Sequence, residues 1–261
     1  MRSDAFETFS ARLAEGVRAH PDMIGLVLLG SAADSAAHRR DEWSDHDFFA
    51  ITRPGRGGVL RPDLSWLPER HRVVLTAREG EIGFAAVYDD GHVLEFALSD
   101  AAELAGAVAG DASVVVDDEG GTVAALITAS QERAAAMDAF DPANDARLVL
   151  VKILVGVGRA RRGETLVAGS LVRQWAVQHL VSAIRGRFPE RSTSSRDEID
   201  AARRFETDFP VEASRIASAL AAPVETAARE VFAATRDILE PGWADFPADA
   251  ADVVARRLGW S

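Results

Sequence analysis

The sequence predicts an α+β protein, with a mixed sheet flanked by helices in the first half and a helical bundle in the second half. Short apolar runs bounded by Gly, Pro and Asp, which are typical of strands, occur mainly before residue 118. Stretches with apolar residues at three- and four-residue steps, which are typical of amphipathic helices, dominate after residue 122. We therefore expect two domains, 1–120 and 121–261, divided near the Gly120–Gly121 pair.

The first half begins with an expected helix over residues 4–19, whose apolar side chains fall on one face. An apolar run at 23–29 predicts a buried strand that stops at Gly30–Ser31. Ser99 or Asp100 is in position to cap a helix over residues 101–108. Further strands, with a hairpin turn at Asp89–Gly91, are expected at 46–52, 72–77, 82–88, 93–98 and 113–116.

The second half is expected to consist of helices separated by prolines and by Gly163, because proline starts or ends a helix more readily than it continues one. The serine-rich segment Arg191–Arg196 is expected to be a mobile loop. The predicted helices cover residues 122–139, 144–162, 165–187, 211–220 and 223–239.

Composition limits the possible classes of function. The chain has 29 basic and 41 acidic residues, and its net charge of −12 argues against non-specific nucleic-acid binding. A locally basic pocket, or a polyanion bound together with a metal ion, stays compatible with this charge. The absence of Cys excludes disulfides, thiolate catalysis and Cys-based zinc sites. No run of about 18 apolar residues and no signal-peptide core is present, so we expect a cytoplasmic protein without a membrane span.

The second predicted strand carries a pair of carboxylates. Because side chains alternate along a strand, Asp45 and Asp47 are expected on one face, while His46 and Phe48 pack on the other. Two carboxylates this close repel each other, which favours a cation between them. Oxygen ligands in a chain without Cys favour Mg²⁺, which shares its coordination shell with substrate phosphates.

Two further features are expected to complete this site. Gly30 and Ser31, directly after a buried strand, offer backbone amides and a hydroxyl group to a phosphate, and glycine allows close approach. Glu95 interrupts the apolar strand at 93–98, where a charge without a partner is costly. It is therefore the candidate for a third acid at the metal ion.

A Gly-Ser turn, a spacer, Ser-Asp-x-Asp on a second strand and a later strand acid together resemble the nucleotidyltransferase fold of the polymerase-β type. The two-domain layout is similar to the bacterial nucleotidyltransferases that adenylylate aminoglycosides or lincosamides. The resemblance implies that Asp45 and Asp47 hold Mg²⁺, and that Glu95 joins them or acts as the base toward the acceptor hydroxyl. It also implies that Gly30 and Ser31 form the phosphate turn.

By motif the resemblance covers roughly residues 20–100, and it extends to the helical half only by layout. The sequence departs from the family at two points. The spacer between Ser31 and Asp45 is longer than usual and has Ala32–Ala37 where a second glycine is often found. The third acid is Glu rather than Asp.

The helical half offers further candidates. Lys152 is the only lysine in the chain, and similar enzymes use a basic residue from this domain at the triphosphate. Arg159 follows seven positions later, on about the same helical face. Glu164 and the Asp197–Glu198 pair are candidates to meet a cationic acceptor. The tryptophans Trp43 and Trp175 are expected to pack in a core or at its rim rather than to stack on a ligand.

Together these residues predict an ATP- and Mg²⁺-dependent nucleotidyltransferase that transfers a nucleoside monophosphate, AMP in the leading case, to a hydroxyl of a small molecule. An aminoglycoside or related antibiotic is the leading acceptor, because a negative protein attracts a polycation, and antibiotic resistance is the implied role. Adenylylation of a partner protein, as in nucleotidyltransferase antitoxins, and a non-catalytic nucleotide-binding module stay open as alternatives. The acceptor, the preferred nucleotide and the oligomeric state are not determined by the sequence.

Overall fold

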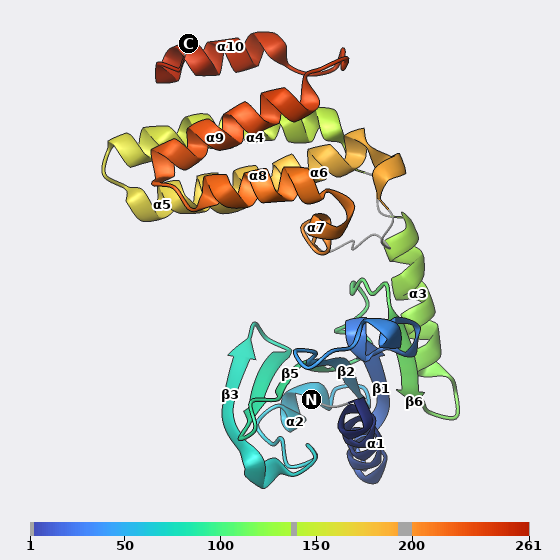
Figure 1. Cartoon of the computed structure of the whole chain (residues 1–261). Helices are drawn as coiled ribbons and strands as arrows, with labels where there is room; N and C mark the ends of the chain where they lie inside the picture. Colours follow the sequence, from blue (N-terminus) through green and yellow to red (C-terminus); the bar gives the residue numbers. More distant parts are fainter. Residues whose placement is uncertain (1–2, 137–139, 193–199, 261) are drawn as a thin grey trace. The chain divides into compact units, whose positions relative to one another are not determined.

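The computed structural model describes residues 3–136, 140–192 and 200–260 of the chain. Within these residues the protein is α+β, with one mixed six-stranded sheet and ten α-helices, as the sequence predicts. The chain divides into two compact units, Met1–Met137 and Asp138–Ser261. The sheet belongs to the first unit, and the second unit is helical (Figure 1).

The sheet has the strand order β3-β4-β5-β2-β1-β6. Strands β2 and β5 run parallel, and all other neighbouring strands run antiparallel. All the strands that the sequence predicts are present, and the first two have the predicted bounds. The strands are β1 (Met23–Leu29), β2 (His46–Thr52), β3 (Val73–Glu79), β4 (Gly83–Tyr88), β5 (Val93–Asp100) and β6 (Ala112–Val116).

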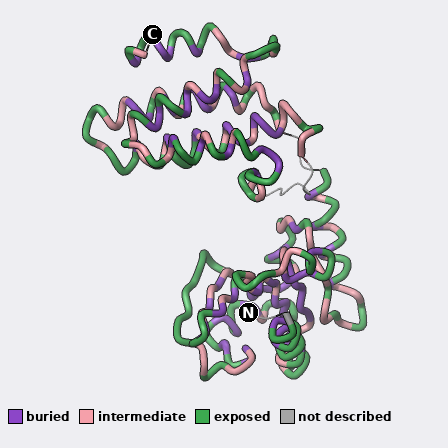
Figure 2. The backbone as a smooth tube through the Cα atoms, viewed as in Figure 1, coloured by how far each residue is buried: buried purple, intermediate pink, exposed green. Residues whose placement is uncertain are grey.

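Helices pack on both faces of the sheet. Helix α1 (Ser3–Ala19) buries Phe6 and Leu13 against one face, in a core that includes Phe48 of β2. Helix α3 (Thr122–Ala136) buries Val123 and Ile127 on the opposite face and contacts β1 and β6. A short helix, α2 (Gly57–Leu60), follows β2. Buried residues accordingly line the sheet and the inner sides of the helices (Figure 2).

Helix α3 packs with the sheet, whereas the sequence analysis assigned residues 122–139 to the helical domain. Gly25 in β1 lies so close to this helix that an added Cβ atom would be 2.3 Å from Val123 Cγ2. Helical periodicity shows that this segment is a helix but not which unit it joins, so the contacts of Val123 decide the matter. The predicted last residues of this helix, 137–139, lie outside the described residues.

The second unit is built around a single helical core, with Ile153, Leu180 and Val231 fully buried. A π-helical segment, Ser170–Ala176, joins two of its helices, so the run predicted at 165–187 is continuous but contains a wider turn. Across the part of the chain that the structure describes, no helix combines the length and the hydropathy needed to cross a bilayer. The helices are α4 (Pro142–Arg161), α5 (Thr165–Gly169), α6 (Val177–Arg187), α7 (Phe205–Asp208), α8 (Pro210–Leu220), α9 (Val224–Leu239) and α10 (Ala248–Leu258).

Two predictions about local structure were wrong or incomplete. Residues 101–106 form turns, although Asp100 and Glu103 make the reciprocal hydrogen bonds of a helix capping box. Gly106 and Gly110 follow, and each lowers the helix propensity of the segment. The sequence analysis also missed α10, whose buried face completes the helical core. The loop predicted at Arg191–Arg196 lies outside the described residues from residue 193 onward.

Candidate functional site

Three of the predicted site segments meet beside β2, because β1 and β5 are its two neighbours in the sheet. Asp47 in β2 is in register with Leu29, the residue before Gly30, and also with Glu95 in β5. The predicted phosphate turn and the predicted third acid therefore flank the same carboxylate. An added Cβ atom at Gly30 would lie 4.0 Å from Asp47 Oδ2, which confirms how closely the turn approaches this acid.

Asp47 and Glu95 form the closest acid pair of the site by register. Parallel strands in register present such side chains on the same face, with strands about 4.8 Å apart. Like charges directly opposite each other destabilise a sheet, whereas a cation held between them removes the repulsion. Asp47 is half-buried and Glu95 is exposed, so the pair is open to a ligand from the solvent side.

Asp45 precedes β2 and is half-buried. It lines a cavity of about 710 Å³ together with Glu95, whereas Asp47 and Glu95 line a neighbouring cavity of about 310 Å³. Within residues 3–136, 140–192 and 200–260, no three acidic or histidine side chains are grouped closely enough to hold a metal ion. The oxygen donors still suit Mg²⁺, which proteins commonly bind through one or two carboxylates plus substrate phosphates.

The opposite face of β2 packs into the core, as expected for His46. Its ring is fully buried and stacks on Phe6 at a centroid distance of 3.7 Å. His46 Nε2 lies 2.9 Å from Ser10 Oγ, and His46 Nδ1 lies 2.7 Å from His92 Nε2. Burial, reinforced by the neighbouring His92, lowers the pKa of His46 to about 3. His46 is therefore neutral, and Asp47 faces away from it because strand side chains alternate.

Gly30 has a φ of +51°, in the left-handed region that glycine adopts at least cost. It begins a 3₁₀ helix, Gly30–Ala32, which is followed by a second one at Asp34–Arg39. Arg40 holds this turn: its Nε donates to the carbonyl of Ser31 at 2.7 Å, and its Nη2 donates to the carbonyl of Ala32 at 2.7 Å. Sequence reasoning missed Arg40, although turn carbonyls that need donors are a reason to look for such a residue.

The long spacer between Ser31 and Asp45 is packed rather than open. Three of its alanines, Ala32, Ala33 and Ala36, are fully buried. The backbone N–H of Asp34 donates to Ser113 Oγ at the beginning of β6. The extra length and the missing second glycine are therefore accommodated by a compact segment next to the predicted phosphate turn.

Trp43 is 87% exposed, so the expectation that it packs in a core was wrong. A rigid turn presents it to solvent: the Trp43 N–H donates to Asp41 Oδ1 at 2.8 Å, and the Asp41 N–H donates to Ser44 Oγ at 3.0 Å. Trp43 lines the larger cavity. The exposed position of Trp43 at this cavity could not be predicted from sequence, because the alternation of side chains along a strand does not extend into the turn that precedes the strand.

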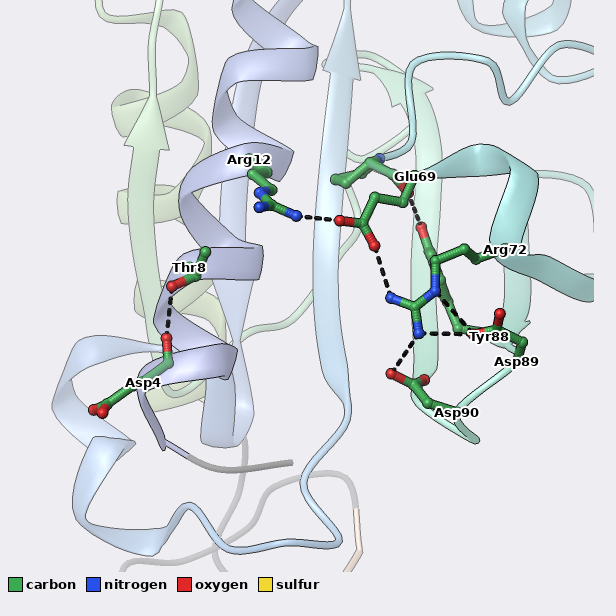
Figure 3. A network of polar contacts seen from close by, with 9 residues as sticks. Asp4, Thr8, Arg12, Glu69, Arg72, Tyr88, Asp89 and Asp90 are labelled. Atoms are coloured by element: carbon green, nitrogen blue, oxygen red, sulfur yellow. Dashed lines mark hydrogen bonds and ion pairs between the residues drawn. The ribbon is translucent and has the colours of Figure 1, made fainter.

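The facing wall of the larger cavity is the turn between β4 and β5. Arg72 holds this turn by donating to Asp89 Oδ1 at 2.9 Å and to Asp90 Oδ2 at 2.9 Å (Figure 3). A third bond runs from Arg72 to Glu69 at 2.7 Å, and Glu69 also pairs with Arg12 of α1. These contacts tie the cavity wall to the helix that covers the other face of the sheet.

In the helical unit, α4 carries both predicted nucleotide contacts. Lys152 is half-buried, and its Nζ lies 5.7 Å from the ring centroid of Trp175. Arg159 donates to Glu164 Oε2 at 2.6 Å, so Glu164 already serves as its partner. Trp175 is 47% exposed, which excludes a core position but not the rim position that was also expected. Lys152 and Arg159 belong to the second unit, whereas the acids and the Gly-Ser turn belong to the first.

A histidine–aspartate pair, which sequence reasoning missed, joins α6 to α4, the helix that carries Lys152. His179 Nδ1 and Asp145 Oδ1 are 2.8 Å apart. Burial raises the pKa of Asp145, while the bond to His179 acts in the opposite direction. The Asp197–Glu198 pair, also expected near an acceptor, lies outside the described residues.

No protein-family model and no curated protein sequence matches the chain. Similar solved structures include a nucleotidyltransferase-like protein from Exiguobacterium sibiricum, at 11% identity, 98% coverage of this chain, 80% coverage of that chain and a TM-score of 0.36. An aminoglycoside 6-adenyltransferase from Bacillus subtilis is similar at 10% identity, with 100% and 93% coverage and a TM-score of 0.32. Both names fall in the class that the sequence resembles. Because the TM-scores are low, we argue the function from the residues of this chain alone.

Proposed function

We propose that the protein is a nucleotidyltransferase that moves a nucleoside monophosphate, AMP from ATP in the leading case, onto a hydroxyl group of a small molecule. The observation that carries this proposal is the register that places Asp47 between the Gly30 turn and Glu95. The Gly30 N–H donates to the Asp111 carbonyl at 3.0 Å, so the turn offers the Ser31 residue rather than the Gly30 amide to a phosphate. A tight turn of this kind beside paired carboxylates is suited to a phosphate chain that arrives with a divalent cation.

The residues of the first unit have different proposed roles. Asp47 and Glu95, with Asp45 nearby, are the proposed Mg²⁺ ligands, and Mg²⁺ would neutralise the triphosphate and align the reacting oxygen. Gly30 and Ser31 are the proposed phosphate contacts. Glu95 is exposed and lines both cavities, so it is also the proposed base that takes the proton of the acceptor hydroxyl.

Lys152 and Arg159 are the proposed nucleotide contacts of the helical unit. Lys152 beside Trp175 offers an ammonium group to a phosphate oxygen and an aromatic face to a base. Arg159 is paired with Glu164, so its charge is partly satisfied within the protein. We therefore assign the larger contribution to Lys152.

The proposed acceptor is an aminoglycoside or a related antibiotic in the cytoplasm. The test is incubation with ATP, Mg²⁺ and a panel of aminoglycosides and lincosamides, followed by measurement of pyrophosphate release and product mass. Asp47→Asn is expected to lower the turnover by at least about 100-fold, because a metal-bound charge supplies several kcal/mol at the transition state. Glu119→Gln, at an exposed position of the same unit, is the matched control.

Other results would overturn parts of this proposal. Transfer to a co-expressed protein but to no small molecule would replace the antibiotic acceptor with a protein target. Absence of any transfer, together with unchanged ATP binding in Asp47→Asn, would show a nucleotide-binding module without catalysis. Thermal unfolding of each variant establishes that lost activity does not reflect lost folding.

A further inference from the structure

We propose that the larger cavity beside Trp43 is the acceptor pocket, and that Trp43 selects acceptors that carry a protonated amine. This inference rests on the proposed function, because it assigns one of the two cavities at the site to one of the two substrates. Four observations support it: the position of the cavity, its charge, the presentation of Trp43 and an unused imidazole nitrogen.

The cavity lies where an acceptor has to bind. Its volume of about 710 Å³ falls in the usual range for small-molecule sites. Asp45 and Glu95 are both part of its wall, and Glu95 also lines the cavity that contains Asp47. A ligand in the larger cavity therefore has the proposed base at one side, next to the acid that faces the phosphate turn.

The charge of the cavity favours a cation. Among the described residues, its lining contains four carboxylates and no Lys or Arg side chain. Asp45 and Glu95 are proposed Mg²⁺ ligands, and Glu42 and Asp90 add negative charge that attracts an ammonium group. Arg72 lies outside the lining and holds Asp90 in place. The residues that line the cavity are Glu42, Trp43, Ser44, Asp45, Asp90, Gly91, His92, Val93 and Glu95.

Trp43 is presented as an aromatic surface for such a cation. Its turn is fixed by the bonds between Asp41 and Ser44, so little conformational freedom is left to lose on binding. An aromatic face attracts a desolvated ammonium group. Within the described ranges, no Lys or Arg lies over Trp43, whereas Lys152 lies over Trp175. The aromatic face of Trp43 is thus open to a cation from outside.

His92 adds a polar group that the protein itself does not satisfy. It is 8% exposed and lines the cavity. His92 Nε2 is used by His46, whereas His92 Nδ1 has no hydrogen-bond partner in the part of the chain that the structure describes. A hydroxyl or amine of the acceptor would supply that partner.

The binding test uses the full chain labelled with ¹⁵N at the tryptophan indoles, with Trp43 assigned through Trp43→Phe. Kanamycin and spermine are the cationic probes, and fully N-acetylated kanamycin is the neutral control with the same rings. Both cationic probes should shift the Trp43 signal and leave the Trp243 signal in place, and the neutral control should not shift Trp43. Absence of a Trp43 shift with both cations, or an equal response to the neutral control, would overturn the proposal.

Variants then separate this inference from the proposed function. Trp43→Ala should weaken kanamycin binding by about tenfold and Trp43→Phe by about threefold or less, in keeping with the strength of a cation–aromatic contact. With any acceptor that is adenylylated, Trp43→Ala should raise the KM for the acceptor and leave the KM for ATP unchanged. An unchanged acceptor KM would overturn the pocket while the proposed function stands. A Trp43 shift without any transfer would overturn the proposed function, while the cavity would stand as a binding pocket for cationic amines.

Discussion

At the scale of single residues, the site depends on the strict alternation of β2. Asp47 lies beside the Gly30 turn and Glu95, while His46 and Phe48 on either side of it are fully buried in the opposite core. This arrangement was predictable from sequence because alternation follows from strand geometry alone. Arg40 and His92 were not predictable, because their partners are brought close only by the tertiary fold.

The positive φ of Gly30 leads to a prediction about this turn. Gly30→Ala places a side chain in the left-handed region and should lower the free energy of unfolding by about 1–2 kcal/mol. Gly55→Ala, at φ +73° with nothing within 4 Å of its added Cβ, is the matched control. Both variants should lose similar stability in urea unfolding. Only Gly30→Ala should also lose at least about tenfold in transfer rate, because the proposed role of this turn is to position phosphate.

The buried His46 predicts a pH dependence of stability. Its folded-state pKa of about 3 lies below the ordinary value near 6.5, so the unfolded chain binds a proton that the folded chain excludes. The stabilisation that comes from a neutral His46 is fully present above pH 6.5 and is lost as the pH falls toward 3. Within this range the free energy of unfolding decreases by about 1.4 kcal/mol per pH unit.

Urea unfolding between pH 7.5 and pH 5 measures this slope. His46→Gln should reduce the slope of the unfolding free energy against pH by the amount that corresponds to about one bound proton. His71→Gln is the control for loss of an exposed histidine. A slope that the two substitutions reduce equally would contradict the assignment to His46.

At the scale of elements, hydrophobic patterning predicted the strands well and the helices mostly. The sheet strands were found because each combines β-branched residues with bounding turns. The failed helix at 101–108 and the overlooked α10 show the limit of local signals. A capping box forms at Asp100 without a helix behind it, and α10 is stable because its apolar face packs on the helical core.

Two glycines of α4 give a matched pair of predictions. At Gly156 an added Cβ would lie 2.7 Å from Val172 Cγ2, so Gly156→Ala should destabilise the helical unit by about 1–3 kcal/mol. At Gly158 nothing lies within 4 Å of the added atom, so Gly158→Ala should stabilise it by about 0.5–1 kcal/mol through helix propensity. Thermal unfolding tests the opposite signs, and a stabilising Gly156→Ala would refute the close approach of α4 and the π-helical segment.

At the scale of the whole molecule, the chain forms two units with separate cores. The sequence analysis placed the domain boundary at residue 120, because the Gly120–Gly121 pair separates the strand-like runs of the first half from the helical periodicity of the second half. The packing of Val123 and Ile127 on the sheet instead argues that α3 completes the first unit. Only long-range contacts contain this information, so composition and periodicity did not reveal it.

A comparison of fragments tests this boundary. A fragment of residues 1–137 should unfold cooperatively in urea, followed by circular dichroism. A fragment of residues 1–120 lacks the buried Val123 and Ile127 and should lose at least about 3 kcal/mol, because each such side chain contributes about 1.5–3 kcal/mol. Equal stability of the two fragments would restore the boundary at residue 120.

The single lysine has a practical consequence for chemical labelling. Lys152 is the only side-chain amine of the chain, and it lies half-buried against the indole of Trp175. An acylating reagent therefore has one side-chain target, and the modified peptide identifies it without ambiguity. The acylation rate of that amine, measured by mass spectrometry with and without nucleotide, becomes a built-in reporter of what occupies this face of α4.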